Sequence, residues 1–188
     1  MGMWSASAAA VSGEPETAEL SPVERLVDPE ARLQHALDTA YRYLSRRDRT
    51  VREVRQRLEH ERVEPDTIDQ AILSLQDAGY LDDARYAQRF SEDRRELDGW
   101  GADRIERKLV SVGVGAELVA AALAARDGVA ERDAAVAVLR RRYSAPLGTP
   151  RERERGLGFL VRKGYTLELA YEAIRAHERE LAGDPPPG

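Results

Sequence analysis

Apolar residues recur along most of the chain at the three- or four-residue spacing of amphipathic helices, and no segment shows the alternation of a strand. Residues 30–46 form the first predicted helix. Thr50 and Glu53 have the spacing of a capping box and predict the start of a second. Pro65 suits the first turn of a third helix, and Gly79 suits its left-handed end. The pattern predicts an all-α protein that begins with three short helices.

The three-helix plan repeats with a period of about 51 residues, because Leu58, Leu109 and Leu160 are each 51 residues apart. Further apolar columns keep this register: Ile68, Val119 and Ala170; Ala71, Ala122 and Ala173; Ile72, Leu123 and Ile174; and Val54 with Ile105, where the third copy has Gly156. The six remaining helices are expected to start at Asp82 or Asp83, Ala102, Ala116, about residue 130, Thr149 and Thr166. This period exceeds the roughly 40–47 residues of two-helix solenoid repeats and leaves room for three helices.

We therefore predict an elongated array of three tandem three-helix units at residues 30–81, 82–127 and 128–182. Residues 1–29 are small and acidic and lack periodicity, so we expect a disordered N-terminal arm. Residues 183–188 contain three consecutive prolines, and we expect a disordered tail. The predicted core is thus divided among three units.

Composition excludes several classes of site. The 188 residues include no cysteine, which rules out disulfides, thiolate metal sites and a cysteine nucleophile. No apolar run approaches the ~18 residues of a membrane span, and no basic segment precedes the small N-terminal residues as in a secretory signal. These features favour a cytoplasmic protein with no membrane contact.

Charge is distributed unevenly. The first 30 residues carry the whole net charge of −5. Residues 40–62 hold eight arginines against four carboxylates, and residues 140–163 hold eight basic residues against two. Such stretches attract phosphate backbones or acidic protein surfaces. The alternative is a solvated face, in which arginines at helix C-termini only complement the dipole.

No arrangement of side chains in the sequence indicates catalysis. His35, His60 and His177 are scattered and form no ligand pair, so we predict no metal site. Gly99 and Gly101 lack the Lys-Ser/Thr sequence that grips a nucleotide. Since no nucleophile–base pair is recognisable either, we expect no catalytic residues, no cofactor and no enzymatic activity.

Residues 79–90, GYLDDARYAQRF, resemble the central motif of the RecX family of bacterial recombination regulators. Three other segments are similar to motifs of that family: residues 46–58, 101–114 and 159–165. The resemblance extends over residues 31–180. Thr50 replaces the usual serine but keeps a capping hydroxyl, whereas Arg62 stands in a turn that often contains glycine, so that turn is expected to differ. The acidic arm is an addition.

The resemblance implies a protein that binds the RecA recombinase in the groove of its filament and restrains filament growth, ATP hydrolysis and strand exchange in DNA repair and recombination. Single-stranded DNA is a second candidate partner, and we expect a monomer. The candidate contacts are the arginines of the basic stretches, namely Arg46, Arg47, Arg49, Arg52, Arg140, Arg141, Arg151 and Arg155. The residues expected to build the junction between units are Gly79, Tyr80, Leu81, Asp82, Asp83, Arg85 and Tyr86.

Two alternatives remain at this point. A helical-repeat scaffold could bind an unrelated protein, with the arginines forming solvated faces. An enzyme with an unrecognised site ranks last. Salt-dependent binding to single-stranded DNA or to a RecA filament separates the first hypothesis from the scaffold, and turnover lost on one conservative substitution would support the enzyme.

Overall fold

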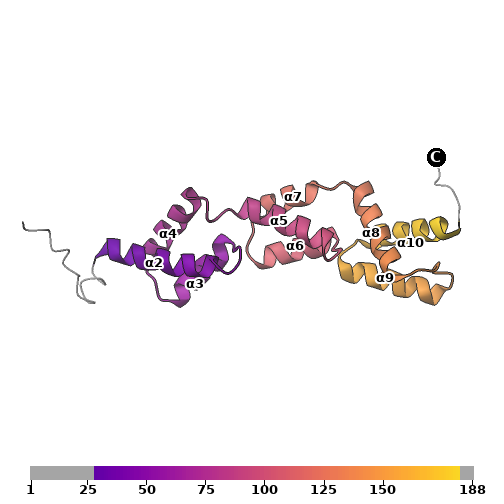
Figure 1. Ribbon diagram of the computed structural model, residues 1–188, viewed down its shortest axis with the longest axis horizontal. Coiled ribbons are helices and arrows are strands. Elements are labelled where there is room, and N and C mark those ends of the chain that lie inside the picture. The colour runs from indigo at the N-terminus through magenta and orange to yellow at the C-terminus, as the bar shows by residue number, and fades with distance from the viewer. Residues whose placement is uncertain (1–27, 183–188) are drawn as a thin grey trace, which may run out of the picture.

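The structure is a computed structural model, and it describes residues 28–182. Within this range the chain forms nine helices and no strand (Figure 1). The helices are α2 (Pro29–Leu44), α3 (Val51–His60), α4 (Pro65–Asp77), α5 (Asp83–Glu96), α6 (Ala102–Ser111), α7 (Ala116–Ala124), α8 (Gly128–Arg142), α9 (Pro150–Lys163) and α10 (Leu167–Ala182). The predicted arm and tail lie outside the described residues, except that Asp28 and Pro29 belong to the start of α2.

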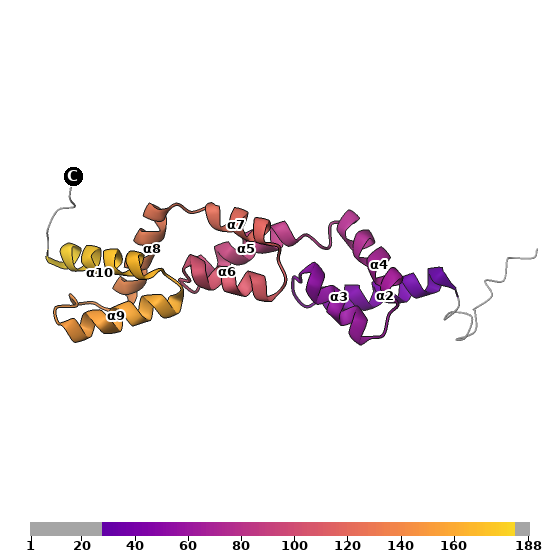
Figure 2. The same cartoon turned by 180° about the vertical axis from the view of Figure 1, so that it is seen from behind.

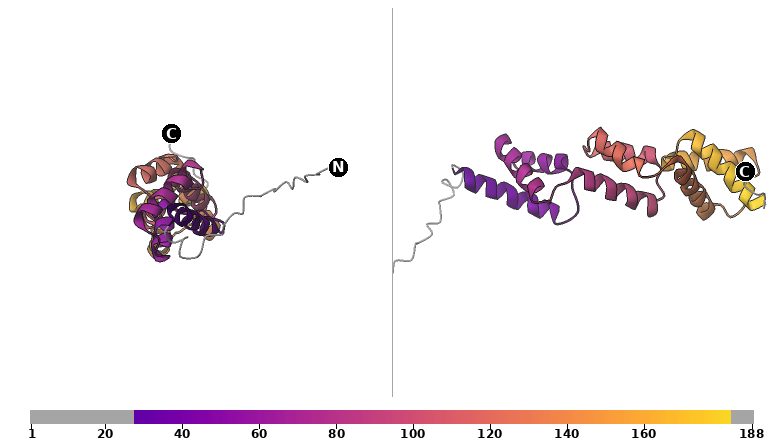
Figure 3. Two further views of the ribbon diagram at one scale, coloured as in Figure 1. Left: turned by 90° about the vertical axis from the view of Figure 1, so that its left-hand side faces the viewer. Right: turned by 90° about the horizontal axis from the view of Figure 1, so that it is seen from above.

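The helices are arranged as three groups in a row, α2–α4, α5–α7 and α8–α10 (Figures 1 and 2). Figure 3 shows the same row from one end and from above. Each group has a separate hydrophobic core, and all the extensive helix–helix contacts join helices of one group. The all-α array of three-helix units is thereby confirmed. The exact limits of the three units, with boundaries after residues 81 and 127, remain a prediction.

The apolar columns of the repeat lie inside these cores. Leu58, Leu109 and Leu160 are each 0% exposed. Gly156 is also buried, and a Cβ atom there would come 2.7 Å from Cδ1 of Leu147. Leu147, from the segment between α8 and α9, therefore fills the space that a larger residue fills in the other two units.

Side-chain caps fix where the helices begin. Thr50 Oγ1 accepts a hydrogen bond from the Glu53 amide, and Glu53 accepts one from the Thr50 amide, each at 3.2 Å. Asp82 rather than Asp83 caps α5. Asp127 accepts from the Ala130 amide at 2.8 Å, so α8 begins two residues earlier than predicted. Among the described helices, none is both long and apolar enough to cross a membrane.

The first junction joins the start of α3 to the second group. The Thr50 hydroxyl donates a 2.6 Å hydrogen bond to the carbonyl oxygen of Val112. The Val51 amide donates to Oδ1 of Asp83 at 2.9 Å. Burial raises the pKa of the Asp83 carboxyl, although the bond from Val51 opposes this shift. A side chain of the second group thus completes the N-terminal hydrogen bonding of α3.

The second junction has two similar contacts, made by the residues 51 positions after Thr50 and Val51, but a backbone amide replaces the Thr50 hydroxyl and Glu131 takes the role of Asp83. The Gly101 amide donates to the carbonyl oxygen of Lys163, and the Ala102 amide donates to Oε1 of Glu131, both at 2.9 Å. This junction is more deeply buried than the first. Glu131 is 8% exposed where Asp83 is half-buried, and Tyr165 is 2% exposed where Val114, its counterpart in the repeat, is 5% exposed. Burial is also the main reason that the pKa of Tyr165 rises to about 12.

Glycine is required in the turn after α6 and in the turn after α9, because each of these turns lies against the preceding group of helices. Gly113 and Gly164 have φ values of +90° and +95°, and a Cβ atom on either would lie within 2.5 Å of an arginine in the preceding group, Arg52 or Arg104. In the first unit Arg62 takes this position at φ 60°. Contrary to expectation, its turn keeps the same hydrogen-bond pattern as the other two, including a 3.1 Å bond from the Val63 amide to the Leu58 carbonyl.

Candidate partner-binding surface

A basic and aromatic groove lies where the last turn of α8 meets α9. The guanidinium carbon of Arg142 is 5.0 Å from the centroid of the Phe159 ring, and Nζ of Lys163 is 5.9 Å from it. Tyr143 meets Phe159 edge to face, with ring centroids 6.3 Å apart. Arg141 also lines the hollow, which has a volume of about 460 Å³. We call this region the α8–α9 groove.

The groove continues into a second hollow of about 300 Å³. The two hollows share Arg142, and the second is also lined by Tyr143, Glu152 and Arg155. Phe159 and Tyr143 are half-buried against the core of the third group. Cations beside partly accessible aromatic rings are found on surfaces that follow a nucleic-acid backbone. The arrangement therefore suits a polyanionic partner.

The two carboxylates beside the groove are already engaged. Asp98 accepts a 2.5 Å hydrogen bond from Arg94. Glu152 belongs to the capping box of α9, and its hydrogen bonds from the amide and hydroxyl of Thr149 lower its pKa. Asp98 is thus paired with Arg94, whereas Glu152 keeps its charge near Arg155. The lining remains basic, because Arg141, Arg142, Arg155 and Lys163 outnumber this one unpaired carboxylate.

Three of the arginines predicted as contacts form ion pairs within the protein. Arg47 and Arg49 lie 2.7 and 3.2 Å from the same Glu53 oxygen. Nε of Arg140 donates to Glu180 at 2.9 Å, which raises the pKa of the arginine. These arginines are paired with carboxylates of the same chain, so only part of each basic stretch is available as free charge.

The other five predicted contacts divide into two kinds. The side chain of Arg52 packs against Gly113 at the first junction. The other four of these five, Arg46, Arg141, Arg151 and Arg155, are exposed and have no ion pair within the described residues. Two of these, Arg141 and Arg155, line the groove.

Comparison with known proteins identifies the family. The family models described as "RecX, first three-helix domain" and "RecX, second three-helix domain" match residues 36–75 and 82–123. The "Regulatory protein RecX" of Amycolatopsis mediterranei is 31% identical over 159 residues, covering 83% of this chain and 90% of that protein. This chain belongs to the RecX family. The RecX protein of Deinococcus radiodurans is 31% identical over 90% of this chain and 79% of its own length.

Solved RecX structures have the same fold. The crystal structure of RecX from Lactobacillus salivarius superposes with a TM-score of 0.70 at 22% identity, covering 79% of this chain and 98% of that one. A second RecX crystal structure gives a TM-score of 0.66 at 21% identity, covering 85% of this chain and 79% of that one.

The segment that most resembles the RecX motif lies at the first junction. Gly79 has a φ of +74°, and its carbonyl oxygen accepts a 2.7 Å hydrogen bond from Arg85. Leu81 is 2% exposed, Asp82 caps α5, and Asp83 bonds the neighbouring unit. Tyr86 stacks on Phe90, whereas Tyr80 is 58% exposed and meets Tyr41 edge to face. The structural role of these RecX motif residues remains a prediction.

The predicted contacts omitted Arg142, Phe159 and Lys163. Phe159 and Lys163 are four residues apart on α9, so the helical pattern alone would have placed them on one face. Their meeting with Arg142 depends on how α8 packs beside α9, which the sequence did not reveal. Among the described residues, no group of three or more potential ligands could hold a metal ion.

Proposed function

We propose that this RecX-family protein is a cytoplasmic, monomeric, non-enzymatic regulator that binds RecA on single-stranded DNA. It restrains filament growth, ATP hydrolysis and strand exchange. The family assignment supports a regulatory role. The observation that carries the proposal is the α8–α9 groove, in which Arg142 and Lys163 lie beside the ring of Phe159 and basic residues outnumber carboxylates in the lining.

The structure allows the proposed contacts to be ordered. Arg141 and Arg155 are placed first because they line the groove without an ionic partner, and Arg142 joins them. Arg46 and Arg151 are exposed contacts outside its lining. The remaining four, Arg47, Arg49, Arg52 and Arg140, would have to leave existing contacts. Exposed ion pairs contribute only about 0–1 kcal/mol, so a polyanionic partner can displace Arg140 from Glu180.

The test is the ATPase rate of RecA on single-stranded DNA as the protein is added at low and moderate salt. Inhibition should weaken as salt rises. The double substitution Arg141→Glu with Arg142→Glu should raise the half-inhibitory concentration at least tenfold. The matched control, Arg107→Glu with Arg175→Glu, changes the same charge at exposed positions outside the lining of the groove and should have a much smaller effect.

Two results would contradict the proposal. Equal inhibition by both double variants would remove the groove from the interface. No effect of the folded wild-type protein on RecA from the same source would favour the scaffold hypothesis, in which the helical array binds a different protein.

A further inference from the structure

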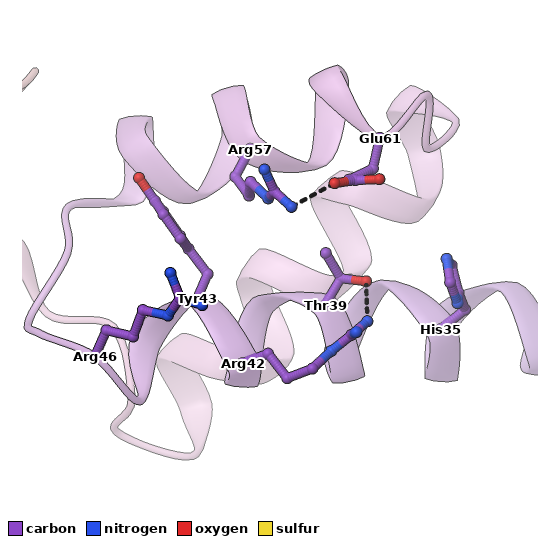
Figure 4. Close-up of a pocket in the computed structure, with 7 residues that line it drawn as sticks. All are labelled: His35, Thr39, Arg42, Tyr43, Arg46, Arg57 and Glu61. Atoms are coloured by element: carbon purple, nitrogen blue, oxygen red, sulfur yellow. Dashed lines mark hydrogen bonds and ion pairs between the residues drawn. The ribbon is translucent and has the colours of Figure 1, made fainter.

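A separate hollow of about 330 Å³ lies between α2 and α3, in the first group of helices (Figure 4). In Figure 4, Arg57 extends from α3, Glu61 follows at the C-terminal end of that helix, and the other labelled side chains come from α2 and the turn after it. The α2 residues are His35, Thr39, Arg42 and Tyr43, and Arg46 lies in the turn that follows α2. None of the seven residues lines the α8–α9 groove.

The hollow has more positive than negative charge. Arg42 donates to the hydroxyl of Thr39 and to the backbone carbonyl of Asp38, each at 3.2 Å, so no carboxylate neutralises it. Within the described residues Arg46 has neither an ion pair nor a side-chain hydrogen bond. Arg57 is paired with Glu61 at 2.5 Å, and Glu61 is the only acidic residue in the lining.

The donors come from two helices and from the turn after the first of them. Arg42 is on α2, Arg46 is in the turn that follows α2, and Arg57 is on α3 across the hollow (Figure 4). The Thr39 hydroxyl accepts from Arg42, and the Tyr43 side chain also lines the hollow. A planar carboxylate offers two oxygens to a donor fork from one side. A tetrahedral phosphate can accept hydrogen bonds from guanidinium groups on several sides at once.

We propose that this hollow binds a phosphate group. The group reaches it either on a free nucleotide or as a phosphodiester of single-stranded DNA. Arg42 supplies charge from α2 and Arg46 from the turn after it, while Arg57 exchanges its bond with Glu61 for one with the phosphate. This proposal does not depend on RecA, because the ligand can be tested alone.

Glu61 should oppose binding, since its carboxylate repels an anion and occupies Arg57. Its position at the C-cap of α3 involves only its backbone amide, which bonds the Arg57 carbonyl. Glu61→Gln should therefore keep the fold and tighten phosphate binding several-fold. An unchanged or weaker affinity in this variant would contradict the proposed role of Arg57.

The experiment is a calorimetric titration of the full chain with inorganic phosphate, ATP and an oligothymidylate. Arg42→Gln with Arg46→Gln should weaken binding of the preferred probe at least about tenfold, since hydrogen bonds to charged groups are lost. The control, Arg107→Gln with Arg175→Gln, removes the same charge elsewhere and should keep most of the affinity. Circular dichroism checks that both variants are folded.

The probes distinguish the two sources of phosphate. Binding of inorganic phosphate and ATP with no loss of oligothymidylate affinity in the Arg42/Arg46 variant assigns the hollow to free phosphates. Loss of oligothymidylate affinity in that variant assigns it to a phosphodiester. The proposal is overturned if none of the three probes binds, or if both double variants bind each probe equally well. Because RecA is absent, neither result depends on the regulatory function.

Discussion

Arg62 and Gly164 occupy equivalent turns of the repeat, and opposite substitutions there should have opposite effects on stability. Both residues have positive φ, at 60° and +95°. They differ in what surrounds them, because Gly164 lies against Arg104 of the neighbouring group. We predict that Gly164→Ala destabilises the protein and that Arg62→Gly stabilises it.

The cost of Gly164→Ala has two sources. An alanine in the left-handed region is strained by about 1–2 kcal/mol. Its Cβ would also lie 2.3 Å from Cβ and 2.5 Å from the backbone nitrogen of Arg104. These atoms belong to the first turn of α6 and cannot move as a flexible side chain would, so overpacking adds about 1–3 kcal/mol. The expected loss is about 2–5 kcal/mol.

Arg62→Gly removes the same backbone strain without creating a clash. The gain of about 1–2 kcal/mol is partly offset, because glycine increases the freedom of the unfolded chain by about 0.5–1 kcal/mol. The Arg62 side chain is exposed and has no ion pair within the described part of the chain. Net stabilisation of about 1 kcal/mol is therefore expected.

Urea unfolding followed by circular dichroism measures both changes. Since repeat units can unfold separately, a local probe is also needed. Trp100 provides one at the second junction, because the guanidinium carbon of Arg104 is 4.0 Å from its ring centroid. In a Trp4→Phe background, Gly164→Ala should lower the urea midpoint seen by Trp100. A shift of the same sign for both substitutions would refute the assignment of Gly164 to a sterically closed junction and Arg62 to an open turn.

Three further substitutions test the cores and junctions. Leu109→Ala should cost about 2–5 kcal/mol in urea unfolding, whereas Val110→Ala, at an exposed neighbour, should change stability by less than about 0.5 kcal/mol. Asp83→Asn keeps an oxygen that accepts from Val51, while it removes a charge whose burial raises the pKa. It should stabilise the protein at pH 7, and the difference from wild type should vanish below about pH 3.9, where the aspartate is protonated in both states. Absorbance titration should show Tyr165 ionising near pH 12 in the folded protein, with loss of this shift in urea.

Local sequence signals predicted much of the fold. Capping residues such as Thr50 and Thr149 determine helix starts through contacts within three residues, so their effect is visible in the sequence. The buried leucine column follows from periodicity. The start of α8 was less accurate because Asp127, its cap, is followed by Gly128, and no capping box marks the position.

The candidate site was less predictable because charge pairing depends on tertiary structure. Arg140 and Arg141 are adjacent and chemically identical in the sequence. The packing of α10 beside α8 brings Glu180 to Arg140 and leaves Arg141 in the groove. Similarly, the sequence places Arg42 near the end of α2 and Arg46 just after it, but their position opposite Arg57 depends on the packing of α2 and α3.

The α8–α9 groove also depends on the second junction. Leu97 and Asp98 line it from the middle group, while Phe159 and Lys163 line it from the last group. Two hydrogen bonds join these walls, from Nζ of Lys163 to the Asp98 carbonyl at 2.6 Å and from the Tyr165 hydroxyl to the Gly99 carbonyl at 3.3 Å. The second junction contains backbone-to-backbone hydrogen bonds, and its carboxylate Glu131 is buried where the first junction has the half-buried Asp83. The groove is therefore preorganised by the better-protected connection of the array. A partner bound there consequently contacts two units whose relative position is already fixed.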